Sequence, residues 1–105
     1  MTVVSYEEEV GPDVIVKVVS QEGYCGAGYN VGDEIRFCGL SVEGKVCIHA
    51  LGTLLPTIKT LKFGGSFPWR DDLNTAGAAC PDAGNPVVFE ITRIPGQVSK
   101  GKDEY

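Results

Sequence analysis

The pattern of hydrophobic and polar positions predicts three strands. Residues 14–19 (VIVKVV) are β-branched almost throughout, while residues 34–38 and 87–94 alternate between apolar and polar side chains. Both patterns are typical of β-strands. The apolar face of each strand holds Val14, Val16 and Val18; Ile35 and Phe37; and Val87, Phe89 and Ile91. We therefore expect these side chains to form one buried face of a sheet.

A central helix is predicted between Cys47 and the Gly64-Gly65 pair. Its apolar stripe recurs at helical spacing through Ile48, Leu51, Leu54, Leu55, Ile58 and Leu61. Gly52 and Pro56 interrupt this stripe, because proline lacks an N–H and its ring presses on the carbonyl of residue 52. The sequence therefore predicts a broken helix, either kinked or divided in two, which Gly64-Gly65 ends in a left-handed conformation.

The expected order is strand, strand, helix, long loop, strand. Because helix and strands do not alternate regularly, we predict an α+β fold with a small, mostly antiparallel sheet packed against one broken central helix. The chain divides into an acidic arm (1–12), a single α+β domain (13–95) and a polar tail (96–105). We expect the arm to be loose, either disordered or with a short strand at Thr2–Tyr6, and residues 66–79 to form the long loop.

The composition limits which binding partners and which cellular compartment we expect for this chain. Nine basic against fourteen acidic residues give a net charge of −5, which would repel nucleic acid. No apolar run approaches the roughly 20 residues of a membrane span, and the acidic start MTVVSYEEEVG does not resemble a secretory signal. We therefore expect a cytoplasmic protein whose four cysteines are thiols or ligands. A domain this small hides only about 60% of its unfolded surface, which favours a homo-oligomer.

Cys47 and His49 are the first candidates for chemistry. Cys47 precedes the predicted helix, where unpaired N–H groups and the helix dipole stabilise a thiolate; the alternative is a buried cysteine that acts as a small hydrophobe. His49 is the only histidine and belongs to a residue type that changes charge near neutral pH, so it is a candidate general acid or base. Its alternative role is a histidine satisfied within the fold.

Other candidates are spread over the remaining loops: Cys25, Tyr29, Phe67, Trp69, Cys80 and Asp82. Cys80 and Asp82 could make polar contacts to a ligand, although Asp82 after a proline could equally be a turn former. Phe67, Trp69 and Tyr29 could be apolar walls of a pocket, and Cys25 lies in a glycine-rich loop that can reach a site. Phe67 and Trp69 could instead form a lid over the core or a subunit interface.

The same residues leave three functions open. The first is a small-molecule site with isomerase, lyase or decarboxylase-type chemistry and no cofactor. The second is a zinc or iron protein with Cys25, Cys47, His49 and Cys80 as ligands, although the chain has no C-x-x-C pair. The third is a non-catalytic oligomeric interaction module built on the aromatic loop.

Several motifs together resemble a known family. Cys47, Val31-Gly32-Asp33, FGGSFPW at residues 63–69, CPD at 80–82 and NPVVFEI at 85–91 are similar to an uncharacterised family of small Cys-containing proteins from bacteria and archaea, many of them anaerobic. The resemblance covers residues 14–94. Members often place a proline after the first helix cysteine, where this chain has Ile48. The family carries no settled activity, so the resemblance singles out Cys47, Trp69 and Cys80 without assigning them roles.

Overall fold

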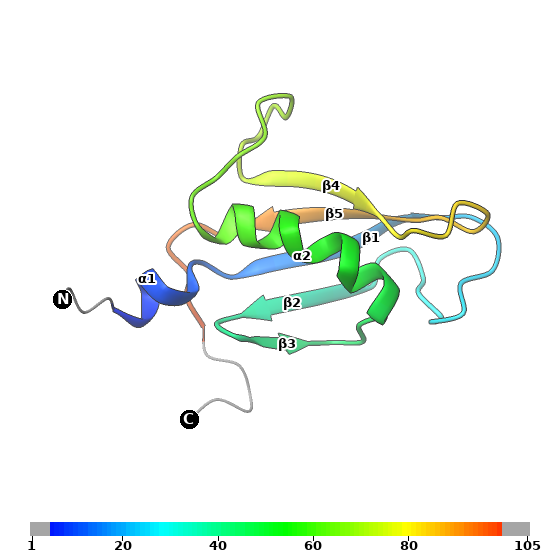
Figure 1. Cartoon of the computed structure of the whole chain (residues 1–105), viewed down its shortest axis with the longest axis horizontal. Coiled ribbons are helices and arrows are strands. Elements are labelled where there is room, and N and C mark those ends of the chain that lie inside the picture. The colour runs from blue at the N-terminus through cyan, green and yellow to red at the C-terminus, as the bar shows by residue number, and fades with distance from the viewer. Residues whose placement is uncertain (1–4, 100–105) are drawn as a thin grey trace.

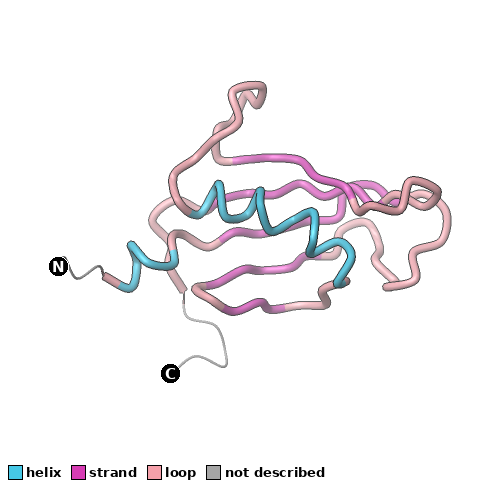
Figure 2. Tube along the Cα trace, viewed as in Figure 1, coloured by secondary structure: helices cyan, strands magenta, loops and turns pink. Residues whose placement is uncertain are grey.

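The computed structural model describes residues 5–99, which form a five-stranded sheet with one long helix across it (Figure 1). The elements are α1 (Tyr6–Val10), β1 (Val14–Gln21), β2 (Glu34–Cys38), β3 (Ser41–Glu43), α2 (Ile48–Lys62), β4 (Thr75–Ala79) and β5 (Val87–Arg93). The strand order is β3-β2-β1-β5-β4, and all neighbouring strands are antiparallel. Figure 2 shows α2 as a second layer over the sheet. The predicted α+β class and antiparallel sheet are confirmed.

The core lies between α2 and the face of the sheet that the alternation predicts. Val16 in the central strand β1 pairs with Ile35 of β2 on one side and with Ile91 of β5 on the other. All three side chains are buried, and Leu54 and Ile58 of α2 belong to the same cluster. Since burial of such a side chain contributes about 1.5–3 kcal/mol, this contact fixes the helix on the sheet.

Two strands were not predicted, because their sequences carry no strand pattern. Strand β4 (TAGAA) lies inside the expected long loop 66–79, so that expectation is wrong for residues 75–79. It is a strand because it pairs with β5, with Ala76 opposite Ile91 and almost fully buried. Strand β3 pairs with β2 in a region for which no helix or strand was predicted. Pairing with a well-formed neighbour outweighs weak strand propensity at both places.

Helix α2 is continuous, so its expected division in two is wrong. Pro56 lies inside the helix, yet Pro56 and Gly52 are both exposed. The Gly52 carbonyl that loses its helical partner to proline can therefore be hydrated. Gly64, which follows the C-cap residue Phe63, has φ 89°, as the predicted left-handed ending requires. Ile48, the first residue of the predicted stripe, is exposed instead.

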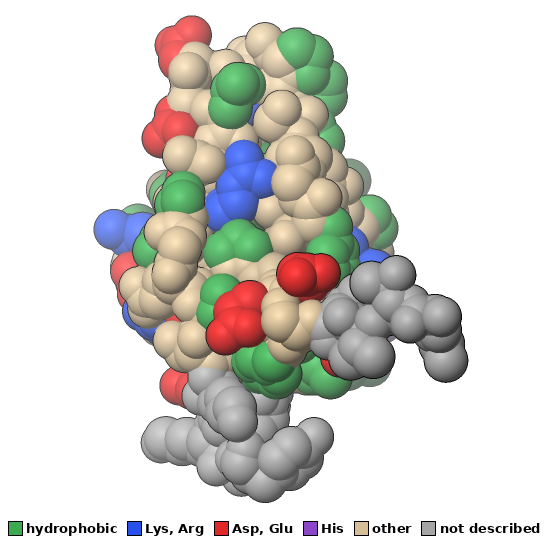
Figure 3. All heavy atoms as spheres, turned by 90° about the vertical axis from the view of Figure 1, so that its left-hand side faces the viewer, with side chains coloured by type: hydrophobic (Ala, Val, Ile, Leu, Met, Phe, Trp, Pro, Cys, Tyr) green, Lys and Arg blue, Asp and Glu red, His purple; other side chains and the backbone are tan. Residues whose placement is uncertain are grey.

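The described part of the acidic arm forms a helix. The Ser5 side chain accepts a hydrogen bond from the backbone N–H of Glu8 at 3.2 Å and so caps α1. The glutamates of the first turn stabilise α1, because they lie at the positive end of the helix dipole. Since Tyr6–Val10 is helical, the expectation of a loose arm or of a strand that reaches Tyr6 is wrong. Residues 1–4 of that arm and 100–105 of the expected tail lie outside the described residues. Figure 3 views this end, where acidic, basic and hydrophobic side chains are interspersed.

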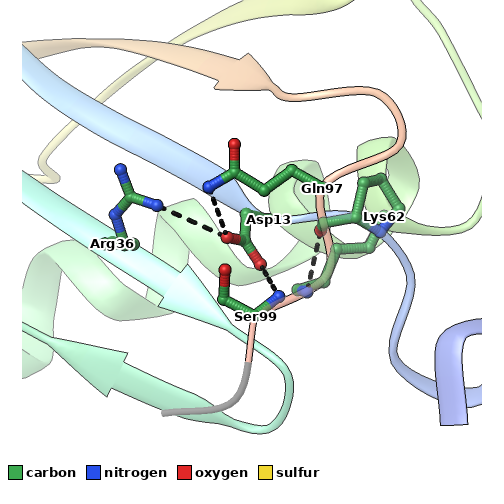
Figure 4. A network of polar contacts seen from close by, with 6 residues as sticks. Asp13, Arg36, Lys62, Gln97 and Ser99 are labelled. Atoms are coloured by element: carbon green, nitrogen blue, oxygen red, sulfur yellow. Dashed lines mark hydrogen bonds and ion pairs between the residues drawn. The ribbon is translucent and has the colours of Figure 1, made fainter. Parts of the chain in front are cut away.

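A buried carboxylate joins the two ends of the described chain (Figure 4). Asp13 is fully buried and accepts hydrogen bonds from Arg36 Nη1 (3.4 Å), Gln97 Nε2 (3.2 Å) and the Ser99 backbone N–H (2.9 Å). Nearby, Lys62 Nζ donates to the carbonyl of Val10, the last residue of α1, at 2.9 Å and to the carbonyl of Pro12 at 3.0 Å. These contacts compensate the buried charge and hold residues 97–99 against the start of β1.

Candidate functional site

Opposite α1, three connections meet at the start of α2 (Figure 1): residues 22–33, 44–47 and 80–86. They surround a cavity of about 590 Å³, a volume typical of sites for small ligands. Six of the residues predicted from the sequence line it: Cys25, Tyr29, Cys47, His49, Cys80 and Asp82. The fold thus brings together residues that lie up to 57 positions apart in the chain, counted from Cys25 to Asp82 (82 − 25).

The two longer connections are bound to each other. The Tyr24 backbone N–H donates to Asn85 Oδ1 at 2.8 Å, and the Glu22 N–H donates to the Pro86 carbonyl at 3.0 Å. Gly23 has φ 69°, and a Cβ there would lie 2.1 Å from Asn85 Oδ1. Only glycine fits this contact. The sequence predicted no role for Asn85, whose side chain fixes this wall of the cavity.

Tyr29 links the glycine-rich loop to the start of the helix. Its hydroxyl donates to the Lys45 carbonyl at 2.9 Å and accepts from the Cys47 backbone N–H at 2.8 Å. Burial raises the pKa of the Tyr29 phenol, so the hydroxyl stays protonated and keeps both bonds. The ring packs edge-on against Phe89 at 5.7 Å between centroids. Tyr29 is therefore more than an apolar wall, because it holds the Cys47 backbone in place.

Cys25 lies in a turn that stabilises its thiolate. Hydrogen bonding from the backbone N–H of Tyr29, foremost, and from those of Ala27 and Gly28 holds the pKa of the Cys25 thiol below its usual value. The Lys45 ammonium adds to this effect, while partial burial opposes it. The Gly28 N–H also donates to the Cys25 carbonyl at 3.0 Å and closes the turn. No residue pattern predicted this arrangement, because it depends mainly on backbone N–H groups.

The other thiols have different surroundings. All four cysteines are free. Cys80 Sγ accepts from the Val87 N–H at 3.2 Å, and Cys47 is half-buried at the N-cap of α2 without a side-chain cap hydrogen bond. Cys38 is buried in β2 away from the cavity, and burial raises the pKa of its thiol. Cys38 can therefore serve as an internal reference when the reactivity of the cavity thiols is measured.

The Asp82 side chain is hydrogen-bonded within its own turn, whereas the His49 side chain is exposed. Asp82 Oδ1 accepts from the backbone N–H groups of Gly84 (3.1 Å) and Asn85 (3.2 Å), and Oδ2 accepts from Asn85 Nδ2 (3.2 Å). Asp82 is thus a turn former, the alternative role considered for it. His49 is exposed in the first turn of α2 and lines the cavity at its edge.

Phe67 and Trp69 lie away from this cavity. Their rings are 5.2 Å apart, in the connection between α2 and β4. Phe67 packs partly against the core, whereas Trp69 is 75% exposed and borders a separate polar hollow next to Arg70, which pairs with Glu90. The prediction that these two rings form walls of the same site is not supported by this placement.

Within residues 5–99, no group of three or more His, Cys, Asp or Glu side chains is arranged to hold a metal ion. Cys25, Cys47, His49 and Cys80 share a cavity, yet they do not form a ligand cluster for zinc or iron. None of the helices in that range is long and apolar enough to cross a membrane. No protein-family model, curated protein or solved structure matches this chain. The family resemblance of its motifs therefore stays a prediction.

Proposed function

We propose that the cavity at the start of α2 binds a small molecule and that the Cys25 thiol is its reactive group. The observation that carries this proposal is the lining, which combines three thiols with the only histidine of the chain. Ala27, Ala50 and Val87 add apolar surface to the wall, which Tyr29, Asp82 and Asn85 also line. A ligand in this space would lie against sulfur atoms and apolar surface.

The chemistry available there is nucleophilic and acid–base. A thiolate is the nucleophilic form of cysteine, and the turn around Cys25 favours it. His49 and Cys47 line the same space and are candidate proton donors and acceptors. These groups suit isomerisation, elimination or decarboxylation. A cytoplasmic location would keep the thiols reduced.

The pH dependence of alkylation tests this proposal. We expect Cys25 to react with iodoacetamide at lower pH than Cys38, because a lowered pKa leaves more thiolate at a given pH and a raised pKa leaves less. Peptide mass spectrometry would follow each cysteine between pH 5 and pH 9. The rapid phase should vanish in Cys25→Ser and persist in Cys38→Ser. A Cys25 no faster than in the denatured chain would contradict the proposal.

A second role is favoured by the exposed aromatic segment. Residues 63–74 extend beyond the β4 edge of the sheet (Figure 1), and Phe63, Trp69 and Leu73 are all exposed there. Large exposed aromatic side chains of this kind commonly anchor protein interfaces. We propose that the chain forms a homo-oligomer through this segment, independently of the cavity.

Light scattering after size exclusion would test the oligomer. We expect Trp69→Ala to lower the molar mass toward that of one chain. Tyr24→Ala is the matched control, because Tyr24 is 78% exposed and Trp69 is 75% exposed. A wild-type chain that is monomeric at high concentration, or a Trp69→Ala variant that keeps the wild-type mass, would exclude this interface.

A further inference from the structure

Among the described residues that line the Cys25 cavity, there is no lysine or arginine to pair with an anionic ligand. Lys45 lies outside the lining, where its Nζ donates to the Gly28 carbonyl at 3.0 Å and lies 5.4 Å from the centre of the Tyr29 ring. Because Lys45 is already engaged in these contacts, an anionic ligand on the apolar wall would find no charged side chain of the lining to offset the loss of its hydration.

The cavity already contains the site for one negative charge. The Gly28 N–H closes a turn on the Cys25 carbonyl at 3.0 Å, and the backbone N–H groups of this turn hold the pKa of the Cys25 thiol below its usual value, which favours the thiolate. Asp82, the lining carboxylate, has both oxygens bound within its own turn. A second anion beside the thiolate would be repelled, and repulsion is stronger at an apolar wall than in water. The favoured ligand is therefore uncharged.

We propose that the cavity takes an uncharged α,β-unsaturated carbonyl compound and isomerises its double bond by reversible addition of Cys25. This inference rests on the proposed function and specifies its substrate class. A thiolate is a soft nucleophile suited to a conjugated carbon, and the surrounding apolar residues suit an uncharged conjugated chain. Decarboxylation fits less well, because its substrate carries a carboxylate that the lining does not pair.

The step is balanced without any co-reactant. The sulfur lone pair forms a C–S bond to the β-carbon, while the π pair of the C=C bond moves to give an enolate. Rotation about the resulting single bond follows, after which the enolate re-forms the double bond and expels the thiolate. The reacting atoms carry one negative charge throughout, first on sulfur and then on oxygen, so the step adds no charge to the cavity.

Dimethyl maleate, an uncharged cis-alkene diester, is a direct probe. We expect the protein to convert it into dimethyl fumarate at least tenfold faster than N-acetylcysteine at an equal concentration of thiolate, as measured by proton NMR. Maleate, the matched dianion, should show no such gain over N-acetylcysteine. Cys25→Ser should abolish the gain, whereas Cys38→Ser should keep it, since Cys38 lies away from the cavity.

Two further results separate this inference from the proposed function. In one result, Cys25 is alkylated rapidly, but the rate gain over N-acetylcysteine is equal for the diester and the dianion, or is absent for both. This result would overturn the substrate class and leave the proposal of a reactive thiol intact. A Cys25 that is not alkylated rapidly would overturn both. If Cys25→Ser fails to fold, wild-type protein alkylated only at Cys25 replaces it; retention of the gain in that protein would contradict the inference.

Discussion

Gly23 lies where the two longer connections around the cavity meet, and a larger residue does not fit there. Its φ of 69° favours glycine, and a Cβ there would lie 2.1 Å from the Asn85 oxygen that accepts the Tyr24 N–H bond. We expect Gly23→Ala to lower the free energy of unfolding by about 1–3 kcal/mol, because both the backbone strain and the lost contact act in the same direction. Urea denaturation followed by fluorescence would measure it.

Gly26→Ala is the matched control for that substitution. It lies in the same loop, has no positive φ, and a Cβ there would meet nothing within 4 Å. We expect a change within about 0.5 kcal/mol of zero, as for surface positions without special contacts. If Gly23→Ala were equally mild, the bond between Tyr24 and Asn85 would not be holding the two connections together.

At the scale of elements, a glycine inside α2 lowers the stability of the helix. Gly52 lies in the helix interior, is exposed, and has no atom within 4 Å of the position of a Cβ. We expect Gly52→Ala to stabilise the protein by about 0.5–1 kcal/mol through higher helix propensity. The same substitution at Gly64, where φ is 89°, should instead destabilise by about 1 kcal/mol. Thermal unfolding of both variants would show the opposite signs, and equal signs would contradict the helix boundaries.

How far the sequence predicts each element depends on how much of its stability is local. The alternation at Ile35 and Phe37 reports their burial directly, because each strand buries one face. Strand β4 has five small or polar residues and exists through its pairing with β5, a contact that no local pattern encodes. Pro56 misled the helix prediction in the opposite way, since the local penalty is met by hydration on an exposed face.

The sequence predicted which types of residue line the site, but it did not predict the role of each residue. Thiols and a lone histidine are recognisable in any sequence, and six of the expected residues line one cavity. The lowered pKa of the Cys25 thiol comes from the backbone N–H groups of a turn, which side-chain identities do not specify. Asn85 likewise acts through a contact with residue 24, 61 positions away in the chain.

The whole molecule has a structural end and a candidate functional end, joined by β1 (Figure 1). Asp13, just before β1, binds the C-terminal part of the described chain, whereas Tyr29, in the connection after β1, holds the start of α2 at the cavity. The two residues share no hydrogen-bond partner. Sites that share no partners and lie well apart usually contribute independently to stability.

A double-mutant cycle tests that independence. Asp13→Asn weakens a buried charged contact, and Tyr29→Phe removes the hydroxyl that bridges Lys45 and Cys47. We expect each to cost about 1–3 kcal/mol in urea denaturation, and the double variant to equal their sum within about 0.5 kcal/mol. Asp13→Asn should also leave the alkylation rate of Cys25 unchanged. A coupling above about 1 kcal/mol would mean that β1 transmits changes between the ends, and residues remote from the cavity would then also govern the reactivity of its thiol.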